Sequence, residues 1–111
     1  MNITMPRGDI QMVTFTVTYP DEPQDVQLTE IYFTVKKTFN DKNFIFQKKL
    51  SAGQIELIDN ATYQFTIESS DTDNMSFGRY VFDIELVGDD IKHTEIGDFI
   101  LTQEVTHVSN E

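Results

Sequence analysis

The segment from Gly78 to Leu86 alternates between apolar and polar side chains, and this pattern limits the fold more than any other feature of the chain. Every second residue is apolar: Tyr80, Phe82, Ile84 and Leu86. The residues between them, apart from Val81, are charged: Arg79, Asp83 and Glu85. Side chains alternate across a strand with a period of two, so the pattern predicts a strand with one buried face and one wet face. We expect the Tyr80 and Phe82 side to form the centre of a core.

Similar alternation recurs along the chain and predicts seven or eight strands. We place them at residues 2–5, 13–19, 28–38, 44–48, 55–58, 61–68, 78–86 and 91–105. Their expected inward residues include Val13, Phe15, Val17, Tyr19, Ile31, Phe33, Val35, Tyr63, Phe65 and Ile67. The only helical signal is a single turn within residues 69–75, with Ser69 or Ser70 as its N-cap. Because no helix is long enough for a parallel crossover, the pattern predicts an all-β, antiparallel sandwich or barrel.

Length and composition indicate one domain. We expect a single β-domain over residues 1–107 of the 111-residue chain, followed by a frayed tail at 108–111. Cysteine is absent, which excludes disulfides, thiolate metal sites and thiol nucleophiles. No apolar run is long enough for a membrane span, and no basic stretch leads into an apolar segment at the N-terminus. We therefore predict no signal peptide and no membrane partner.

The chain is strongly acidic, with a net charge of −11. Such a charge repels nucleic-acid backbones, so nucleic acid is not an expected partner. Of the eight basic residues, five gather in one predicted hairpin: Lys36, Lys37, Lys42, Lys48 and Lys49. The simpler interpretation is solvated strand edges and turns, where lysine discourages edge-to-edge aggregation. The alternative is a small positive docking patch.

No motif in the chain spells out a reaction. His93 and His107 lack partners at metal-ligand spacing, and no nucleophile-elbow, phosphate-loop or zinc-protease motif occurs. Acidic pairs such as Asp71 and Asp73 fit solvated turns better than a calcium site. Two further acidic clusters have the same interpretation: Asp21, Glu22 and Asp25, and Asp89 and Asp90. We expect no enzyme activity, no metal and no cofactor.

Two short features have structural interpretations. Arg7-Gly8-Asp9 is the tripeptide that integrin ligands display, but its place between two predicted strands favours a plain turn built on Gly8 and Asp9. Gly97 lies within the last predicted strand and suggests a bulge or bend.

Aromatic side chains on the wet faces offer candidate binding residues. Tyr32 and Ile45 point away from their core-facing neighbours, and Phe39 lies in a predicted turn. We interpret them first as contacts to another protein or subunit, and second as a sugar-binding platform that would also use Tyr19. The candidate partner contacts are therefore Tyr32, Lys36, Lys37, Phe39, Lys48 and Lys49.

Taken in order, these segments resemble the immunoglobulin-like N-terminal module of siphovirus upper baseplate proteins and related phage or prophage modules. The segments that carry the resemblance are Ile3–Asp9, Leu28–Lys37, Phe44–Lys48, Ser69–Thr72, Gly78–Ile84 and Gly97–Thr106. The family's usual C-terminal stalk does not follow here, so we do not carry over a receptor-binding role.

The resemblance implies an immunoglobulin-like sandwich with a structural, protein-binding function in a phage tail, neck or baseplate. Its expected partners are other virion proteins and other copies of itself in a ring, located in the virion or the cytoplasm of a bacterial host. Tyr80, after Gly78 at the start of its strand, resembles an immunoglobulin tyrosine corner, with its hydroxyl expected to bond to backbone near Asp73 or Asn74. The alternative function is a carbohydrate- or cell-surface-binding sandwich.

Overall fold

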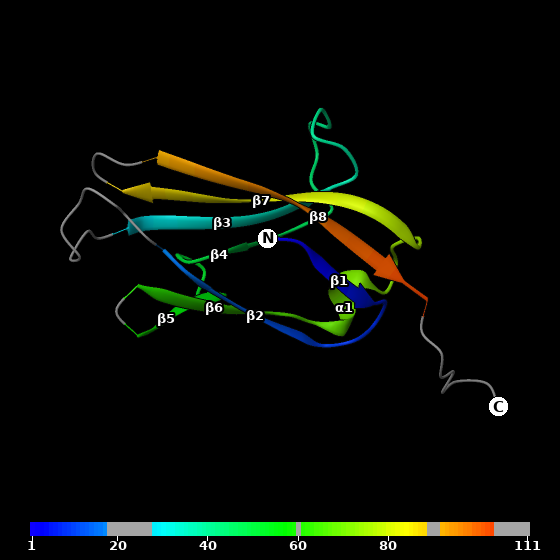
Figure 1. Cartoon of the computed structure of the whole chain (residues 1–111), viewed down its shortest axis with the longest axis horizontal. Coiled ribbons are helices and arrows are strands. Elements are labelled where there is room, and N and C mark those ends of the chain that lie inside the picture. Colours follow the sequence, from blue (N-terminus) through cyan, green and yellow to red (C-terminus); the bar gives the residue numbers. More distant parts are fainter. Residues whose placement is uncertain (18–27, 60, 89–91, 104–111) are drawn as a thin grey trace.

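The computed structural model describes residues 1–17, 28–59, 61–88 and 92–103, and within them the chain forms two packed β-sheets (Figure 1). The five-stranded sheet has the order β1-β8-β7-β3-β4, and the three-stranded sheet the order β2-β6-β5. In chain order the elements are β1 (Ile3–Pro6), β2 (Gln11–Thr16), β3 (Leu28–Lys36), β4 (Phe46–Lys49), β5 (Ile55–Asp59), β6 (Thr62–Ile67), α1 (Ser69–Thr72), β7 (Gly78–Gly88) and β8 (Lys92–Thr102).

This arrangement is an immunoglobulin-like sandwich, which confirms the predicted fold class. The chain passes between the two sheets as in that fold, with β2, β6 and β5 on one side and β3, β7 and β8 on the other. One pair departs from the antiparallel expectation, because β1 runs parallel to β8, with Ile3 opposite Phe99 and Pro6 opposite Thr102. After β1 the chain crosses to β2 in the other sheet. No hairpin turn therefore forces β1 to run antiparallel to the strand beside it.

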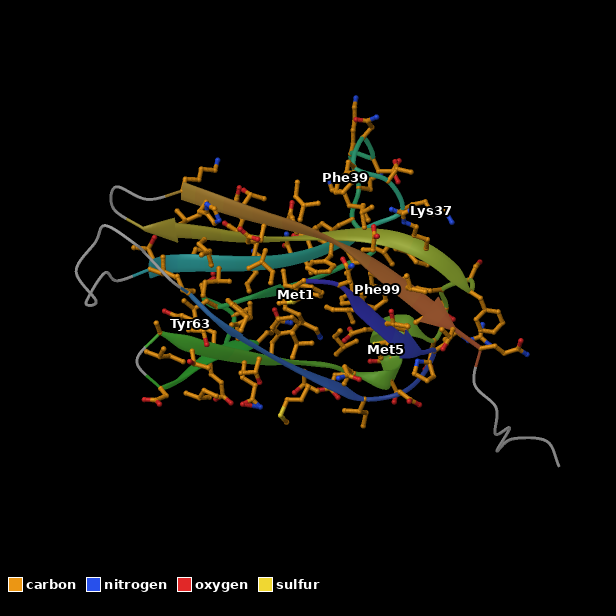
Figure 2. All side chains as sticks on the ribbon, in the orientation of Figure 1. Met1, Met5, Lys37, Phe39, Tyr63 and Phe99 are labelled. Atoms are coloured by element: carbon orange, nitrogen blue, oxygen red, sulfur yellow. The ribbon has the colours of Figure 1, made fainter. Side chains whose placement is uncertain are left out.

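The core lies between the sheets and is centred on phenylalanine rings. The ring centroids of Phe33 on β3 and Phe65 on β6 are 4.4 Å apart, which joins the two sheets directly. Phe82 on β7 lies 5.3 Å from Phe33. Met5, Tyr63 and Phe99 also point into this space (Figure 2). The described inward residues that alternation predicts on β3, β6 and β7 are buried: Ile31, Phe33, Val35, Tyr63, Phe65, Ile67, Tyr80, Phe82, Ile84 and Leu86.

The single helical turn is present, but its cap differs from the prediction. Glu68 is the N-cap of α1, so the assignment of this role to Ser69 or Ser70 is wrong. The Asp71 carboxylate accepts the backbone N–H of Glu68 at 2.7 Å, which satisfies a donor at the helix start. This hydrogen bond places the N-cap one residue before Ser69 and two residues before Ser70, the two predicted cap positions.

The Arg7-Gly8-Asp9 segment is a turn that packs against α1. Gly8 has a φ of +84°, which a glycine adopts without strain. Its N–H donates to the Thr72 hydroxyl at 2.8 Å, and the Asp9 N–H donates to the Pro6 carbonyl at 3.3 Å. Thr72 is fully buried, so the turn is anchored inside the domain as the structural interpretation predicts.

The predicted tyrosine corner is present with a different partner. The Tyr80 hydroxyl donates to the Ser76 carbonyl at 2.7 Å, so the corner closes on a residue nearer in sequence than Asp73 or Asn74.

The predicted bulge or bend at Gly97 is wrong, because Gly97 lies in register opposite Phe82. A side chain at this position would collide with the Met1 carbonyl and the Phe82 ring, which explains the glycine.

Several sequence predictions fall outside the described residues: Tyr19, the acidic clusters at residues 21–25 and 89–90, His107 and the tail at 108–111. No helix in the described part of the chain is long and apolar enough to cross a membrane.

Candidate interaction surface

The outer face of the five-stranded sheet carries most of the candidate residues. It consists of the side chains that alternate with the buried ones, and strand register sets them in rows. One row places Tyr32 between Lys49 and Glu85, and the next places Thr34 between Gln47 and Asp83. β8 adds Ile96 beside Asp83 and Asp98 beside Val81. Charged and apolar groups therefore alternate closely over this face.

The connection between β3 and β4, residues 37–45, stands above this face on the side away from the three-stranded sheet (Figure 1). We call it the β3–β4 loop. Its apolar side chains are exposed, with Phe39 at 54%, Phe44 at 51% and Ile45 at 40%. The Lys36 ammonium donates to the Asp41 carbonyl at 2.9 Å, and the Asp41 N–H donates to the Thr38 carbonyl at 3.2 Å. The loop thus presents apolar groups on a backbone held by its own hydrogen bonds.

The predicted contacts Lys36, Lys37 and Phe39 are brought together at the base and tip of this loop. Figure 2 shows Lys37 and Phe39 projecting from it. The Lys37 ammonium lies 4.8 Å from the centre of the Tyr80 ring, a cation–π contact. Lys49 and Tyr32 form a second such contact, at 5.9 Å, further along the outer face of the five-stranded sheet.

Lys48 does not belong to this surface, which corrects its assignment to an exposed basic patch. Its residue exposure is 7%, and its ammonium lies 2.7 Å from the Asp71 carboxylate of α1. The alternation of β4 places Lys48 on the same side as the buried Phe46, and Lys49 on the wet side. Lys48 therefore holds the edge strand β4 against the helical turn.

Asp83 is a titratable group on this face whose environment alters its pKa. Burial raises the pKa of its carboxyl above the ordinary value, the nearby Glu85 charge adds to the rise, and Lys36 opposes it. Asp83 lines a small cavity of about 30 Å³ together with Thr34, Lys36, Val81 and Phe39. The β3–β4 loop thus reaches the charged row at the centre of the sheet.

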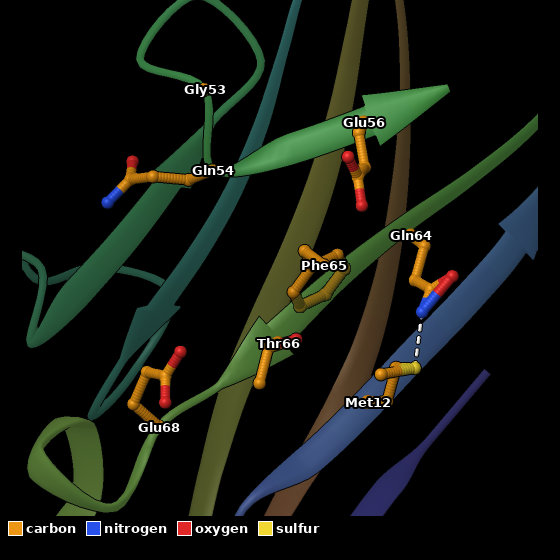
Figure 3. A pocket seen from close by; sticks show the side chains of 8 residues that line it. All are labelled: Met12, Gly53, Gln54, Glu56, Gln64, Phe65, Thr66 and Glu68. Atoms are coloured by element: carbon orange, nitrogen blue, oxygen red, sulfur yellow. Dashed lines mark hydrogen bonds between the residues drawn. The ribbon is translucent and has the colours of Figure 1, made fainter. Parts of the chain in front are cut away.

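A polar hollow of about 370 Å³ lies on the three-stranded sheet, at its β5 and β6 side (Figure 3). It is lined by Met12, Gly53, Gln54, Glu56, Gln64, Phe65, Thr66 and Glu68. The Gln54 side-chain oxygen accepts the Lys49 N–H at 3.0 Å, and the Gln64 amide contacts the Met12 sulfur. The hollow offers amides, a hydroxyl and two carboxylates. Sequence reasoning did not single it out, although the alternation of β6 places Gln64 and Thr66 outward.

The groups that chemistry or metal binding would need are scattered. His93 lies exposed on β8, where its Nε2 is 2.7 Å from the Glu95 carboxylate. Asp71 is engaged by Lys48 and by the Glu68 backbone. Among the described residues no group of three histidine, cysteine or acidic side chains could hold a metal ion.

Comparison with known proteins finds a similar fold among solved structures and no similar sequence. No protein-family model matches the chain, and no curated protein matches its sequence. An endo-β-1,4-mannanase from Thermotoga petrophila superposes on 93% of this chain with a TM-score of 0.60 and 11% identity. The chain spans only 18% of that enzyme's length. Extracellular domains 3–5 of Drosophila OTK align over 96% of this chain and 34% of theirs, with 20% identity and a TM-score of 0.36. At these identities the mannanase match reflects shared fold alone.

Proposed function

We propose that this chain is a non-enzymatic structural or assembly module of a phage or prophage virion, in its tail, neck or baseplate, that works through protein–protein contacts. The observation that carries the binding role is the β3–β4 loop with its exposed Phe39, Phe44 and Ile45. The virion setting rests on the sequence resemblance to upper baseplate modules.

The loop has the composition of an interface centre. Aromatic residues are enriched at the centre of protein interfaces, where a few buried anchors dominate the binding energy. Phe39 and Phe44 each keep about half of their surface in water. Burying that half against a partner stabilises a complex by about 1 kcal/mol per ring. An exposed apolar cluster on a loop fixed by hydrogen bonds loses little entropy on binding.

The charges around the loop favour an acidic partner surface. Of the eight basic residues, six lie on the outer face of the five-stranded sheet or in the loop: Lys36, Lys37, Lys42, Lys49, Arg79 and Lys92. β2, β5 and β6 carry none. The outer face of the five-stranded sheet also carries Glu30, Asp83, Glu85 and Asp98, so the positive excess lies at the β3–β4 loop, where Lys36, Lys37 and Lys42 outnumber Asp41. Complementary charge of this kind speeds encounter and fixes orientation.

The test is incorporation of the chain into particles purified from the strain that encodes it, measured by mass spectrometry. The wild-type chain should be present, and the double substitution Phe39→Ala with Phe44→Ala should reduce its amount at least tenfold. The matched control is Leu57→Ala with Ile58→Ala on β5, because these side chains are as exposed, at 54% and 48%. A chain absent from particles, or a loop variant incorporated as well as the control, contradicts the proposal.

The second candidate function is carbohydrate binding, and the polar hollow on the three-stranded sheet favours it. Its amides and carboxylates suit sugar hydroxyls. The aromatic platform expected from sequence has less support, because the Tyr32 ring lies beneath Lys49 and Phe39 reaches the Asp83 cavity. A glycan array separates the two functions: specific hits that Gln64→Ala abolishes would support sugar binding, and an array without hits would remove it.

A further inference from the structure

The strand edges of the sandwich differ in how they are protected from pairing with another chain. An exposed edge presents unpaired backbone groups, and proteins guard it with charge, proline or short length. β1 has four residues and contains Pro6. β4 carries Lys48 and Lys49, and β5 carries Glu56 and Asp59. The part of β8 beyond its pairing with β1 has four guards: Lys92, His93, Glu95 and Asp98.

β2 has none of these protections. It reads Gln11-Met12-Val13-Thr14-Phe15-Thr16, without a charged residue or a proline. β-branched and aromatic residues, which favour strands, make up four of its six positions. β2 pairs with β6 on one side, and no other strand in the described part of the chain pairs with it. An uncharged edge is unusual on a chain with a net charge of −11.

Alternation along the ladder identifies which backbone groups of β2 point outward. The Val17 N–H donates to the Ala61 carbonyl at 2.8 Å, which continues the β2–β6 register beyond Thr16. In an antiparallel pair, residues that bond to the partner strand alternate with residues that do not. Val13 and Phe15 therefore bond toward β6. The N–H and carbonyl groups of Met12, Thr14 and Thr16 face away from it.

We infer that β2 is a self-pairing edge, through which two copies of the chain join as an antiparallel β2–β2 dimer. A two-fold axis at Thr14 places Thr14 opposite Thr14 and Met12 opposite Thr16. All three outward residues then exchange backbone hydrogen bonds. Val13 and Phe15 stay on the inner side in both copies, so the buried faces remain aligned. The two three-stranded sheets become one continuous sheet of six strands.

Charge explains why β2, and not another edge, takes this role. No like charges face each other across a β2–β2 ladder, whereas pairing β5 with itself would bring Glu56 and Asp59 close to their copies. Two bodies of charge −11 still repel at longer range, so added salt should strengthen the dimer. The dimer leaves both β3–β4 loops free, and it does not depend on the proposed virion function.

Sedimentation velocity of the full chain over a range of concentrations tests the inference. The wild-type chain should form a dimer as its concentration rises. Thr14→Pro removes an outward N–H and leaves the bonds to β6 intact. Because each dimer then loses two hydrogen bonds, its dissociation constant should rise about thirtyfold. Thr14→Lys should also weaken the dimer by placing two lysines opposite each other.

Thr66→Lys is the matched control, because it adds the same charge to the central strand β6 and leaves the β2 edge unchanged. It should dimerise as the wild type does. A wild-type chain that stays monomeric at high micromolar concentration overturns the inference. So does a Thr14→Lys variant that dimerises like the control, which would place the contact elsewhere.

Amide hydrogen exchange gives a second readout that does not depend on a variant's folding. The amides of Met12, Thr14 and Thr16 should exchange fast in dilute solution and become at least tenfold slower at concentrations where the dimer forms. Protection of these amides that is the same at all concentrations means that the chain's own segments cover the edge, and this result also contradicts the inference.

Discussion

The two sheets of the sandwich meet at one core but present opposite kinds of surface. The five-stranded sheet carries charged rows, partly buried Tyr32 and the β3–β4 loop with exposed phenylalanines. On the three-stranded sheet, β2 and β6 present threonines and glutamines and β5 adds Glu56 and Asp59, and the sheet ends on its other side at the uncharged strand β2. The first kind of surface suits recognition of another protein through side chains, and the second suits pairing through the backbone. One small domain can therefore offer two independent contacts.

Removing the central Phe33–Phe65 contact between the two sheets should have the largest effect on stability. Phe33 is fully buried, and its ring lies 4.4 Å from that of Phe65 on the opposite sheet. Phe33→Ala should lower the free energy of unfolding by about 3–5 kcal/mol through lost burial and a cavity. Chemical denaturation measures this value. Phe39→Ala, on the exposed loop, should change it by less than about 0.5 kcal/mol; similar losses at both sites would contradict the assignment of core and surface.

The two neighbouring lysines of β4 test which side of the five-stranded sheet each occupies. Lys48 pairs with Asp71 at 2.7 Å, and the two side chains are only 9% and 16% exposed. Lys48→Ala leaves the Asp71 carboxylate without its partner and should cost about 1–3 kcal/mol of stability. Lys49→Ala should cost less than about 0.5 kcal/mol. Thermal unfolding measures the melting temperature of both variants. Equal shifts in melting temperature would contradict the buried position of Lys48.

The tyrosine corner should contribute a smaller amount. Tyr80→Phe removes the hydroxyl that donates to the Ser76 carbonyl at 2.7 Å and should lower stability by about 1 kcal/mol. Tyr32→Phe is the control on the outer face of the five-stranded sheet and should change stability little. If the two variants unfold at the same denaturant concentration, the Tyr80 bond has no stabilising role.

The pH dependence from Asp83 should be the smallest effect and sharpens the description of the outer face of the five-stranded sheet. Burial, aided by Glu85, raises its pKa in the folded chain, so the folded state binds this proton at a higher pH than the unfolded state does. Above the folded-state pKa, the charged Asp83 carboxylate therefore lowers the free energy of unfolding. This destabilisation disappears as the pH falls from the folded-state pKa to the ordinary pKa of the unfolded chain.

Asp83→Asn should accordingly raise the melting temperature slightly at neutral pH, with the difference vanishing in acid. Melting curves from pH 7 downward check this, and a variant less stable than the wild type at neutral pH would show that the Lys36 charge outweighs burial.

Alternation in the sequence was sufficient to predict the inward faces of β3, β6 and β7, because a period of two states directly which residues share a face. The same pattern carries no information on direction, so the parallel pairing of β1 with β8 was not predicted. The sequence alone suggests a bulge or bend at Gly97, because the neighbours that require a glycine there, Met1 and Phe82, are distant in the chain.

The candidate surface was partly predictable. Phe39, Lys36 and Lys37 are close in sequence and remain close in space. Charge alone groups Lys48 with them, whereas the period of two along β4 places Lys48 on the same side as the buried Phe46. The polar hollow and the unguarded edge depend on which strands are neighbours, and a single sequence does not show strand order.

Footprinting by hydroxyl radicals tests the central claim, that the chain works through contacts of the β3–β4 loop, most directly. The isolated chain and the chain within purified particles are oxidised side by side, and modification of exposed side chains is compared by mass spectrometry. We predict that Phe39 and Phe44 are modified in the isolated chain and protected in the particle, whereas Leu57 and Ile58 on β5 are modified in both. Equal modification of Phe39 and Phe44 in the two samples would contradict the account.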